Sequence, residues 1–158
     1  MKLKKWLENW DMISLKINIK FLEMEWQPKT ADMDAAWDLY VEMLTRIATQ
    51  PLPETHGDEK TALESVYQLF PLTREIIRQH GRDCSNFTKI AIVVLNQVVR
   101  PFTANWHRLS LAGAFDDPDR CAVFREELAV KQQQLREYTR MLADMAGVED
   151  LTSLEDLA

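Results

Sequence analysis

Glycine, cysteine and histidine are scarce in this sequence, and each scarcity excludes a class of protein. Four glycines and six prolines in 158 residues leave no glycine-rich phosphate loop and no long flexible linker. Cys84 and Cys121 are too few for a disulfide framework, so we expect reduced thiols in a cytoplasmic protein. His56, His80 and His107 lack the close pairing of metal ligands, so neither a metal nor another cofactor is predicted.

Long apolar runs and an excess of positive charge are also missing. The most apolar segment is broken at Pro101 before it reaches the roughly 20 residues that a bilayer requires, so no membrane partner is expected. The net charge of −6 argues against a general affinity for nucleic acid. We expect a single domain, divided into an N-terminal helix and extended segment (1–28), a helical bundle (29–147) and an acidic tail (148–158).

Segment 85–111 is expected to form the central helix. Ser85 and Asn86 are good N-cap residues, and the apolar residues after them cover nearly a whole helical wheel, which is typical of a buried helix. Pro101 disfavours helical geometry at Arg100 and removes a backbone donor. The sequence therefore predicts one bent helix, or two in series that meet at Pro101.

Four long stretches show helical periodicity. They are residues 31–48, 59–80 (with a bend or restart at Pro71), 86–100 and 118–146. The expected buried face of the first consists of Met33, Ala36, Trp37, Tyr40, Leu44 and Ile47. The expected buried seam of the last consists of Phe124, Leu128, Leu135, Tyr138, Leu142 and Met145. The fold class is thus mainly α, a bundle of four to five long helices with an N-terminal extended segment.

Residues 13–26 follow a different period. Apolar side chains alternate with polar ones at Ile13, Leu15, Ile17, Ile19 and Phe21. This alternation predicts a strand, with a β-bulge where the phase slips near 21–22. A helix is the alternative, because Ile13, Ile17 and Phe21 also share a helical face. No other segment alternates as clearly, so the strand would have no partner within the chain.

An unpaired strand edge indicates an association surface, on which a partner protein or a second copy adds a strand. The predicted partner-binding residues are Trp10, Ile13, Leu15, Ile17, Ile19, Phe21, Trp26 and Trp106. Because catalytic motifs are missing, the sequence favours a non-catalytic interaction or regulatory subunit. The chain also resembles small bacterial proteins encoded among defence genes, which implies a place in a bacterial defence or stress assembly.

Arg100 and His107 lie seven residues apart, so on a continuous helix they share a face. The spacing R-x6-H resembles the motif of HEPN ribonucleases, small all-helical proteins of bacterial conflict systems. The resemblance implies an alternative function in which Arg100 binds the scissile phosphate of RNA and His107 assists attack by the 2′-hydroxyl, across a dimer. Pro101 stands where that family usually has a polar residue, and a kink there would separate the two side chains.

Two further interpretations concern the same region. The chain could be a small-ligand sensor whose pocket lies at the Pro101 kink. Alternatively, the region is purely structural: Arg100 binds carbonyls at a helix end, His107 forms a local hydrogen bond, and Phe102 and Trp106 complete the core.

Overall fold

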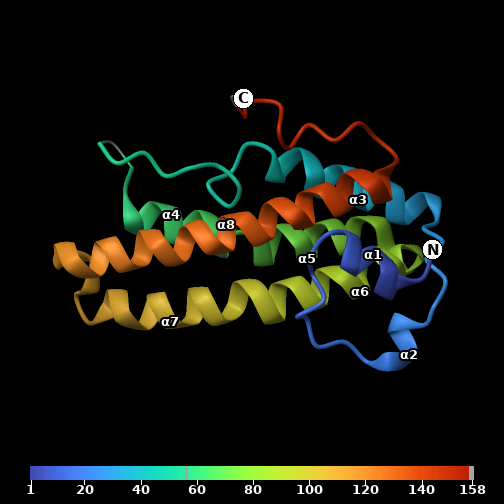
Figure 1. The fold of residues 1–158 in the computed structure, drawn as a ribbon, viewed down its shortest axis with the longest axis horizontal. Helices are drawn as coiled ribbons and strands as arrows, with labels where there is room; N and C mark the ends of the chain where they lie inside the picture. The colour runs from blue at the N-terminus through green and yellow to red at the C-terminus, as the bar shows by residue number, and fades with distance from the viewer. Residues whose placement is uncertain (56, 157–158) are drawn as a thin grey trace.

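The chain folds as a mainly α-helical bundle around one hydrophobic core (Figure 1). The computed structural model describes residues 1–55 and 57–156. Its α-helices are α1 (Leu3–Asn9), α2 (Ile19–Leu22), α3 (Thr30–Met43), α4 (Glu59–Tyr67), α5 (Leu69–His80), α6 (Ser85–Val94), α7 (Arg100–Leu111) and α8 (Pro118–Ala146). Short 3₁₀ turns cover Gly81–Cys84 and Ala114–Asp116, and a π-helical turn covers Leu95–Val99. Figure 1 shows α8 running the length of the molecule, with α6 and α7 end to end alongside it and α3 packed on its C-terminal half.

The bounds and the buried seam of α8 confirm the sequence prediction. The Asp117 side chain accepts a hydrogen bond from the Asp119 N–H at 2.9 Å, and Pro118 occupies the first turn, where its missing donor is not needed. Gly147 ends the helix in the left-handed conformation, at φ 70°. All six predicted seam residues are buried.

The central helix continues through Pro101. A proline ring clashes with the carbonyl four residues before it and cannot donate to that carbonyl. The π-helical turn removes the conflict, because the Arg100 N–H donates to the Leu95 carbonyl, five residues back. Of the two predicted alternatives, the structure therefore has one continuous element made of α6, the π-helical turn and α7.

The helical stretch at 59–80 is divided earlier than predicted. The break between α4 and α5 falls at Gln68, and Pro71 lies in the first turn of α5. A proline in the first turn leaves no hydrogen bond unmade, so it does not interrupt the helix. Asp58 caps α4 by accepting a hydrogen bond from the Thr61 N–H at 2.8 Å, as the sequence indicates.

The predicted buried face of α3 is wrong for Met33 and Trp37, whose side chains are exposed. The residues of α3 that are buried are Asp32, Ala35, Ala36, Leu39, Tyr40 and Met43. The helix also ends at Met43 instead of Ala48, and side chains from the following loop bind its last carbonyls. Thr49 Oγ1 donates to the Met43 carbonyl, and Gln50 Nε2 donates to the Leu44 carbonyl at 3.1 Å.

Asp32 joins the N-termini of α3 and α6. Its carboxylate is fully buried, yet both oxygens are bound. Oδ1 accepts from the Phe87 N–H at 2.9 Å, and Oδ2 accepts from the Lys29 N–H at 2.8 Å and from Asn86 Nδ2 at 3.2 Å. These bonds satisfy backbone donors that the first turns of both helices leave free. One side chain thus fixes α3 against the central helix.

The predicted strand at 13–26 is not present in the structure. Turns occupy residues 13–15, and α2 begins after Asn18, whose side chain accepts from the Lys20 N–H at 2.9 Å. Within the described residues, the β-type pairing is limited to one antiparallel bridge between Lys2 and Glu25. The prediction was wrong because a segment that lies across the surface of the bundle gives the same alternation as a strand. Leu15 and Ile17 of this segment pack against the core.

Side chains replace the missing β-ladder in this segment. Gln97 Oε1 accepts from the Lys16 N–H at 2.6 Å, and Gln97 Nε2 donates to the Lys16 carbonyl at 2.5 Å. A neighbouring strand would satisfy the same two backbone groups. Trp26, at the end of the segment, stacks on Trp6 of α1 with 4.8 Å between their ring centroids, which holds that end against α1.

Removing the Asp32 carboxylate will destabilise the whole fold. Asp32→Ala leaves the Lys29 and Phe87 N–H groups without an acceptor, and Asn86 Nδ2 keeps the Gln27 carbonyl as its acceptor. We therefore expect the free energy of unfolding to fall by about 3 kcal/mol. Urea unfolding followed by circular dichroism measures the change. Asp34→Asn, on the exposed side of the same helix, is the matched control and should change the value by less than about 0.5 kcal/mol. A loss below about 1 kcal/mol for Asp32→Ala would contradict this role.

Gln97→Ala will loosen the N-terminal segment without unfolding the bundle. Because the Lys16 N–H loses its acceptor, we expect hydrogen exchange at residues 13–18 to become at least about tenfold faster. Exchange in α8 should stay unchanged. The control is Gln133→Ala, which removes an exposed amide bound only to Glu137 on its own helix. Equal exchange in the two variants would mean that Gln97 does not hold the segment.

Candidate functional site

Arg100 and His107 both face the α4–α5 pair. The Arg100 guanidinium carbon lies 4.6 Å from the centroid of the Phe70 ring, and the His107 ring meets Tyr67 edge-on at 5.1 Å between centroids. Tyr67 and Phe70 are in contact themselves, with 5.6 Å between centroids. The continuous central helix therefore brings the two motif residues onto one surface. We call this surface the aromatic row; it consists of Arg100, Phe70, Tyr67, His107 and Glu64.

Charged or ionisable groups lie at both ends of the aromatic row, Arg100 at one end and His107 with Glu64 at the other. His107 Nε2 lies 3.4 Å from Glu64 Oε1, an ion-pair distance without the geometry of a hydrogen bond. A second guanidinium, that of Arg74, lies 5.9 Å from the Phe70 centroid. Guanidinium groups bind phosphate, and an imidazole beside a carboxylate can act as a general base. The row thus contains the kinds of group that RNA cleavage requires. Sequence reasoning missed Glu64, Tyr67, Phe70 and Arg74.

Trp106, a predicted partner-binding residue, belongs to the core. Its ring is buried and stacks on Phe115 at 5.9 Å between centroids, and its Nε1 donates to Glu127 at 2.6 Å. Phe102 is buried as well and stacks on Phe124. This part of the central helix therefore holds α7 on α8, as the structural interpretation expects.

The predicted partner-binding residues of the N-terminal part fall into two groups. Trp10, Leu15, Ile17 and Trp26 are half-buried against the core, and Trp10 Nε1 donates to Asp144 at 3.0 Å. Ile13, Ile19 and Phe21 are exposed, the two isoleucines to 68% and 75%. Phe21 also lies under the Lys89 ammonium, with 5.4 Å from Nζ to the ring centroid. Only the second group is available to a partner.

An open groove of about 280 Å³ lies beside Pro101, between α7 and α8. Its lining consists of Pro101, Phe102, Asn105, Glu127, Val130 and Lys131. An amide, a carboxylate and an ammonium in an apolar lining can orient a small polar ligand. The position is that of the predicted ligand sensor, which stays a prediction.

A larger groove, about 400 Å³, lies between α3 and α5. Its lining consists of Trp37, Asp38, Val41, Glu42, Leu72, Glu75, Ile76 and Gln79. Met33, Trp37 and Val41 recur every four residues along α3, and so form one apolar stripe on its outer side. We call these three residues the α3 stripe. Trp37 is 47% exposed and Val41 46%.

The sequence contained one signal of the α3 stripe. Apolar residues occur on every side of α3, and a helix of that kind is normally buried all round. In the structure α3 packs on α8 and α5, and its outer side has no covering element among the described residues. The helix has more apolar residues than one buried face can hold. Sequence reasoning did not explain this excess.

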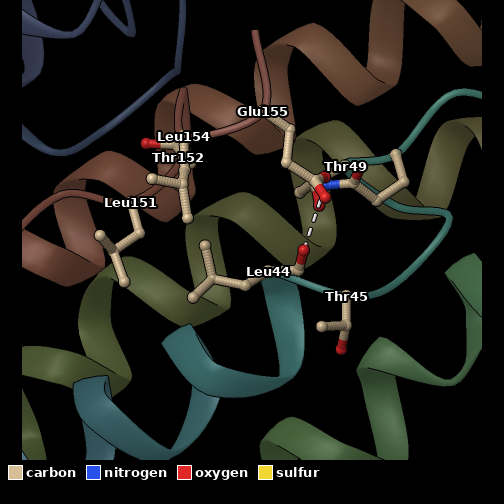
Figure 2. Close-up of a pocket in the computed structure, with 8 residues that line it drawn as sticks. Leu44, Thr45, Thr49, Leu151, Thr152, Leu154 and Glu155 are labelled. Atoms are coloured by element: carbon tan, nitrogen blue, oxygen red, sulfur yellow. Dashed lines mark hydrogen bonds between the residues drawn. The ribbon is translucent and has the colours of Figure 1, made fainter.

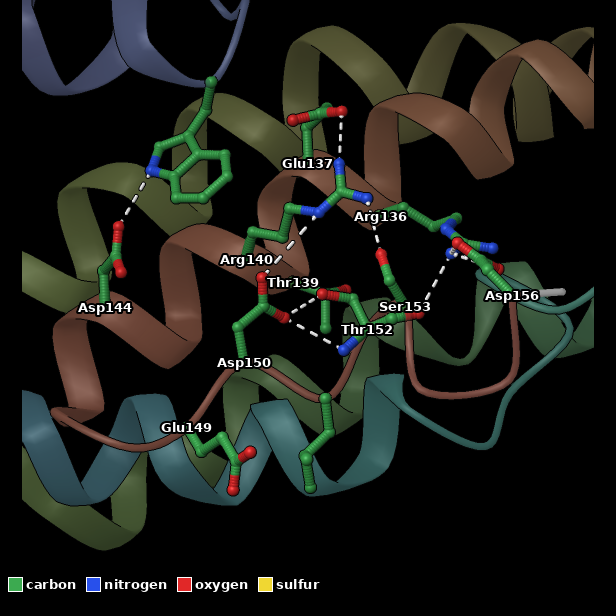
Figure 3. A network of polar contacts seen from close by, with 12 residues as sticks. Arg136, Glu137, Thr139, Arg140, Asp144, Glu149, Asp150, Thr152, Ser153 and Asp156 are labelled. Carbon is green, nitrogen blue, oxygen red and sulfur yellow. Dashed lines mark hydrogen bonds and ion pairs between the residues drawn. The ribbon is translucent and has the colours of Figure 1, made fainter. Parts of the chain in front are cut away.

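The acidic tail lies along α8 and closes another pocket. Figure 3 shows Arg136 bound to Asp156, and Arg140 bound to Glu137, Ser153 and Asp150. The hydrogen bond from Arg136 holds the pKa of Asp156 below its usual range. Tyr40 fixes the start of the tail, since its hydroxyl donates to the Glu149 carbonyl at 2.9 Å.

The pocket closed by the tail has little chemistry to offer. It measures about 240 Å³ and is lined by Leu44, Thr45, Thr49, Gln50, Leu151, Thr152, Leu154 and Glu155 (Figure 2). Among these described lining residues, Glu155 carries the charge and the others are leucines, threonines and one amide. Such a lining provides neither a nucleophile with a base nor a set of metal ligands.

The described residues form neither a metal site nor a membrane-spanning helix. No group of His, Cys, Asp and Glu side chains in residues 1–55 and 57–156 is arranged to hold a metal ion. The helices that the structure describes include none with the length and apolar character to cross a bilayer. His56 and the last two residues of the acidic tail lie outside the described part of the chain. Comparisons with protein-family models, curated proteins and solved structures found no match.

Proposed function

We propose that this chain is a non-catalytic interaction or regulatory subunit that binds a partner protein through the α3–α5 groove. The observation that carries the proposal is the exposed α3 stripe, three large apolar side chains aligned on one helix and bordered by a groove. Scattered exposed apolar residues are ordinary on protein surfaces, but an aligned set beside a groove is typical of an interaction site. A place in a bacterial defence or stress assembly stays a prediction from the sequence resemblance.

Trp37 is the expected anchor of this interface. Tryptophan is enriched among the interface residues that contribute most to binding, and truncating such a residue often costs about 2 kcal/mol or more. The Trp37 ring contacts Tyr40, with 6.0 Å between centroids, so its orientation is partly fixed before binding. Fixed aromatic side chains lose little conformational entropy when a partner covers them.

The exposed N-terminal residues Ile13, Ile19 and Phe21 form a second surface in this proposal. The hydrogen bond between Gln97 and the Lys16 backbone and the cation–π contact between Lys89 and Phe21 hold the segment on the bundle. The side chains of Ile13, Ile19 and Phe21 nevertheless remain exposed. Because this segment forms no strand, a partner cannot add a strand to it as predicted. A partner or a second copy would instead cover these three side chains.

Val41→Ser will weaken partner binding, whereas Val123→Ser will not. The two valines are matched: both are helical, with exposures of 46% and 47%, but Val123 lies on α8 away from the groove. Capture of each variant from the cells that express the chain, followed by quantitative mass spectrometry, measures the recovered partner. We expect at least about tenfold less partner with Val41→Ser, equivalent to about 1.4 kcal/mol. Both variants should unfold within about 0.5 kcal/mol of the parent chain. Equal recovery with both variants would contradict the proposal.

The aromatic row favours a second candidate function, RNA cleavage by a HEPN-like mechanism. Support comes from the two motif residues on one surface and from the carboxylate of Glu64 beside His107. Arg100, with Arg74 across Phe70, would bind the scissile phosphate, and His107 would take the proton of the 2′-hydroxyl. In this candidate function the two copies of the motif would come from a dimer.

Incubation with labelled single-stranded RNA tests the second candidate. If the row is catalytic, His107→Ala should lower the cleavage rate by about 10² or more, because general-base catalysis contributes that much. His80→Ala is the matched control, since His80 binds Asp38 outside the row. Absence of cleavage, or equal cleavage by both variants, would exclude this candidate and leave the interaction function.

A further inference from the structure

The charges that line the α3–α5 groove have one sign. Asp38 and Glu42 from α3 and Glu75 from α5 are in the lining, and its described residues include neither Lys nor Arg. Asp34 extends the same row along α3, one turn before Asp38. The acidic row 34, 38, 42 thus runs beside the apolar row 33, 37, 41, each residue displaced by one position. Like charges at this spacing destabilise an isolated helix, so the arrangement is costly until a cation pairs with it.

The chain supplies partners for only part of this acidic row. His80 Nε2 lies 2.6 Å from Asp38 Oδ2, and Arg46 Nη2 lies 2.8 Å from Glu42 Oε2. The two carboxylate side chains nevertheless stay 37% and 43% exposed. Asp34 and Glu75 are exposed as well. Carboxylate oxygens therefore remain accessible on both sides of the apolar residues that line the groove.

The spacing of the α3 stripe matches a helix in the partner. Residues four apart on a helix are separated by about 6 Å along its axis, so the three side chains of the stripe cover about 12 Å. A helix that lies in a groove between two helices offers apolar side chains at the same interval, as in a bundle. The lining from α5 adds the apolar side chains of Leu72 and Ile76. An anionic partner such as nucleic acid would be repelled by the acidic border.

We infer that the α3–α5 groove binds an amphipathic helix of the partner, whose apolar face is flanked by Lys or Arg side chains. The inference rests on the proposed function and specifies the partner's chemistry at the same surface. Apolar side chains of the incoming helix cover Trp37 and Val41. Its cationic side chains reach Asp34, Asp38 and Glu42 on one side and Glu75 on the other.

Synthetic helical peptides test the inference directly. Two peptides of about 18 residues share one leucine face and differ in their flanks, which are Lys in one and Glu in the other. A third has the composition of the lysine peptide in a scrambled order that removes the apolar face. Fluorescence anisotropy of the labelled peptides, titrated with the full chain at physiological salt, gives the three affinities. We expect the lysine peptide to bind at least about tenfold more tightly than either of the others.

Variants of the chain separate groove binding from general attraction to an acidic protein. Val41→Ser should weaken the lysine peptide about tenfold, Asp34→Asn should weaken it about twofold to fivefold, and Val123→Ser should leave it unchanged. Equal affinity for the lysine and glutamate peptides would overturn the inference. An affinity for the lysine peptide that Val41→Ser does not change would overturn it too.

The outcomes also separate this inference from the proposed function. If Val41→Ser loses the cellular partner while the lysine peptide does not bind the groove, the partner has a different chemistry and only the inference fails. If Val41→Ser retains the cellular partner, the proposed function fails, and the inference fails with it. If light scattering shows a dimer that Val41→Ser dissociates, the groove belongs to a second copy of the chain, which contradicts the inference.

Discussion

The orientation of α3 depends on the buried carboxylate of Asp32. It binds backbone donors of two helices, so a rotation of α3 would leave a desolvated charge and two first-turn amides without partners. Two turns further on, the Tyr40 hydroxyl donates to the Glu149 carbonyl and accepts from the Leu151 N–H. Residues 32, 36 and 40 therefore point inward. Residues 33, 37 and 41, one position on, are turned out of the core, which exposes the α3 stripe.

Other polar side chains hold the two ends of the chain, which have little regular secondary structure, against the bundle. Gln97 pairs with the Lys16 backbone, Trp10 binds Asp144, and Arg136 binds Asp156. Burial raises the pKa of Asp144, and the Trp10 hydrogen bond opposes that rise. The N-terminal segment and the acidic tail are thus fastened by single side chains. The helices that form the α3–α5 groove are instead held by the shared hydrophobic core.

Sequence reasoning succeeded where local signals were strong. Asp117-Pro118 and Gly147 set the bounds of α8, and its apolar residues recur with one period, so the buried face could be identified. It failed on α3 because apolar residues on every side leave the period undefined, and only tertiary contacts decide which side is buried. The prediction of a strand at 13–26 was wrong for a similar reason. Alternation shows which side chains can face a core, but it cannot show that Gln97, some 80 residues away, replaces the β-ladder.

The candidate sites show the same limit. The spacing of Arg100 and His107 predicted a shared face, and both residues lie within α7. The π-helical turn just before α7, which the sequence does not reveal, lets the helix continue through Pro101. Their partners Glu64, Tyr67 and Phe70 come from other helices and could be found only once the fold was known. The α3–α5 groove was not predicted, because it combines residues of two helices that lie 30 or more positions apart.

The most direct measurement of the central claim is site-specific photo-crosslinking in the cells that express the chain. A photoreactive phenylalanine analogue replaces Trp37 in one version and Val123 in another, and the crosslinked peptides are identified by mass spectrometry. If the α3–α5 groove is an interface, position 37 will give adducts with one partner, on a segment with apolar residues at helical spacing flanked by Lys or Arg. Position 123 will not give them. Adducts of equal yield and identity at both positions, or none at position 37, would contradict the account.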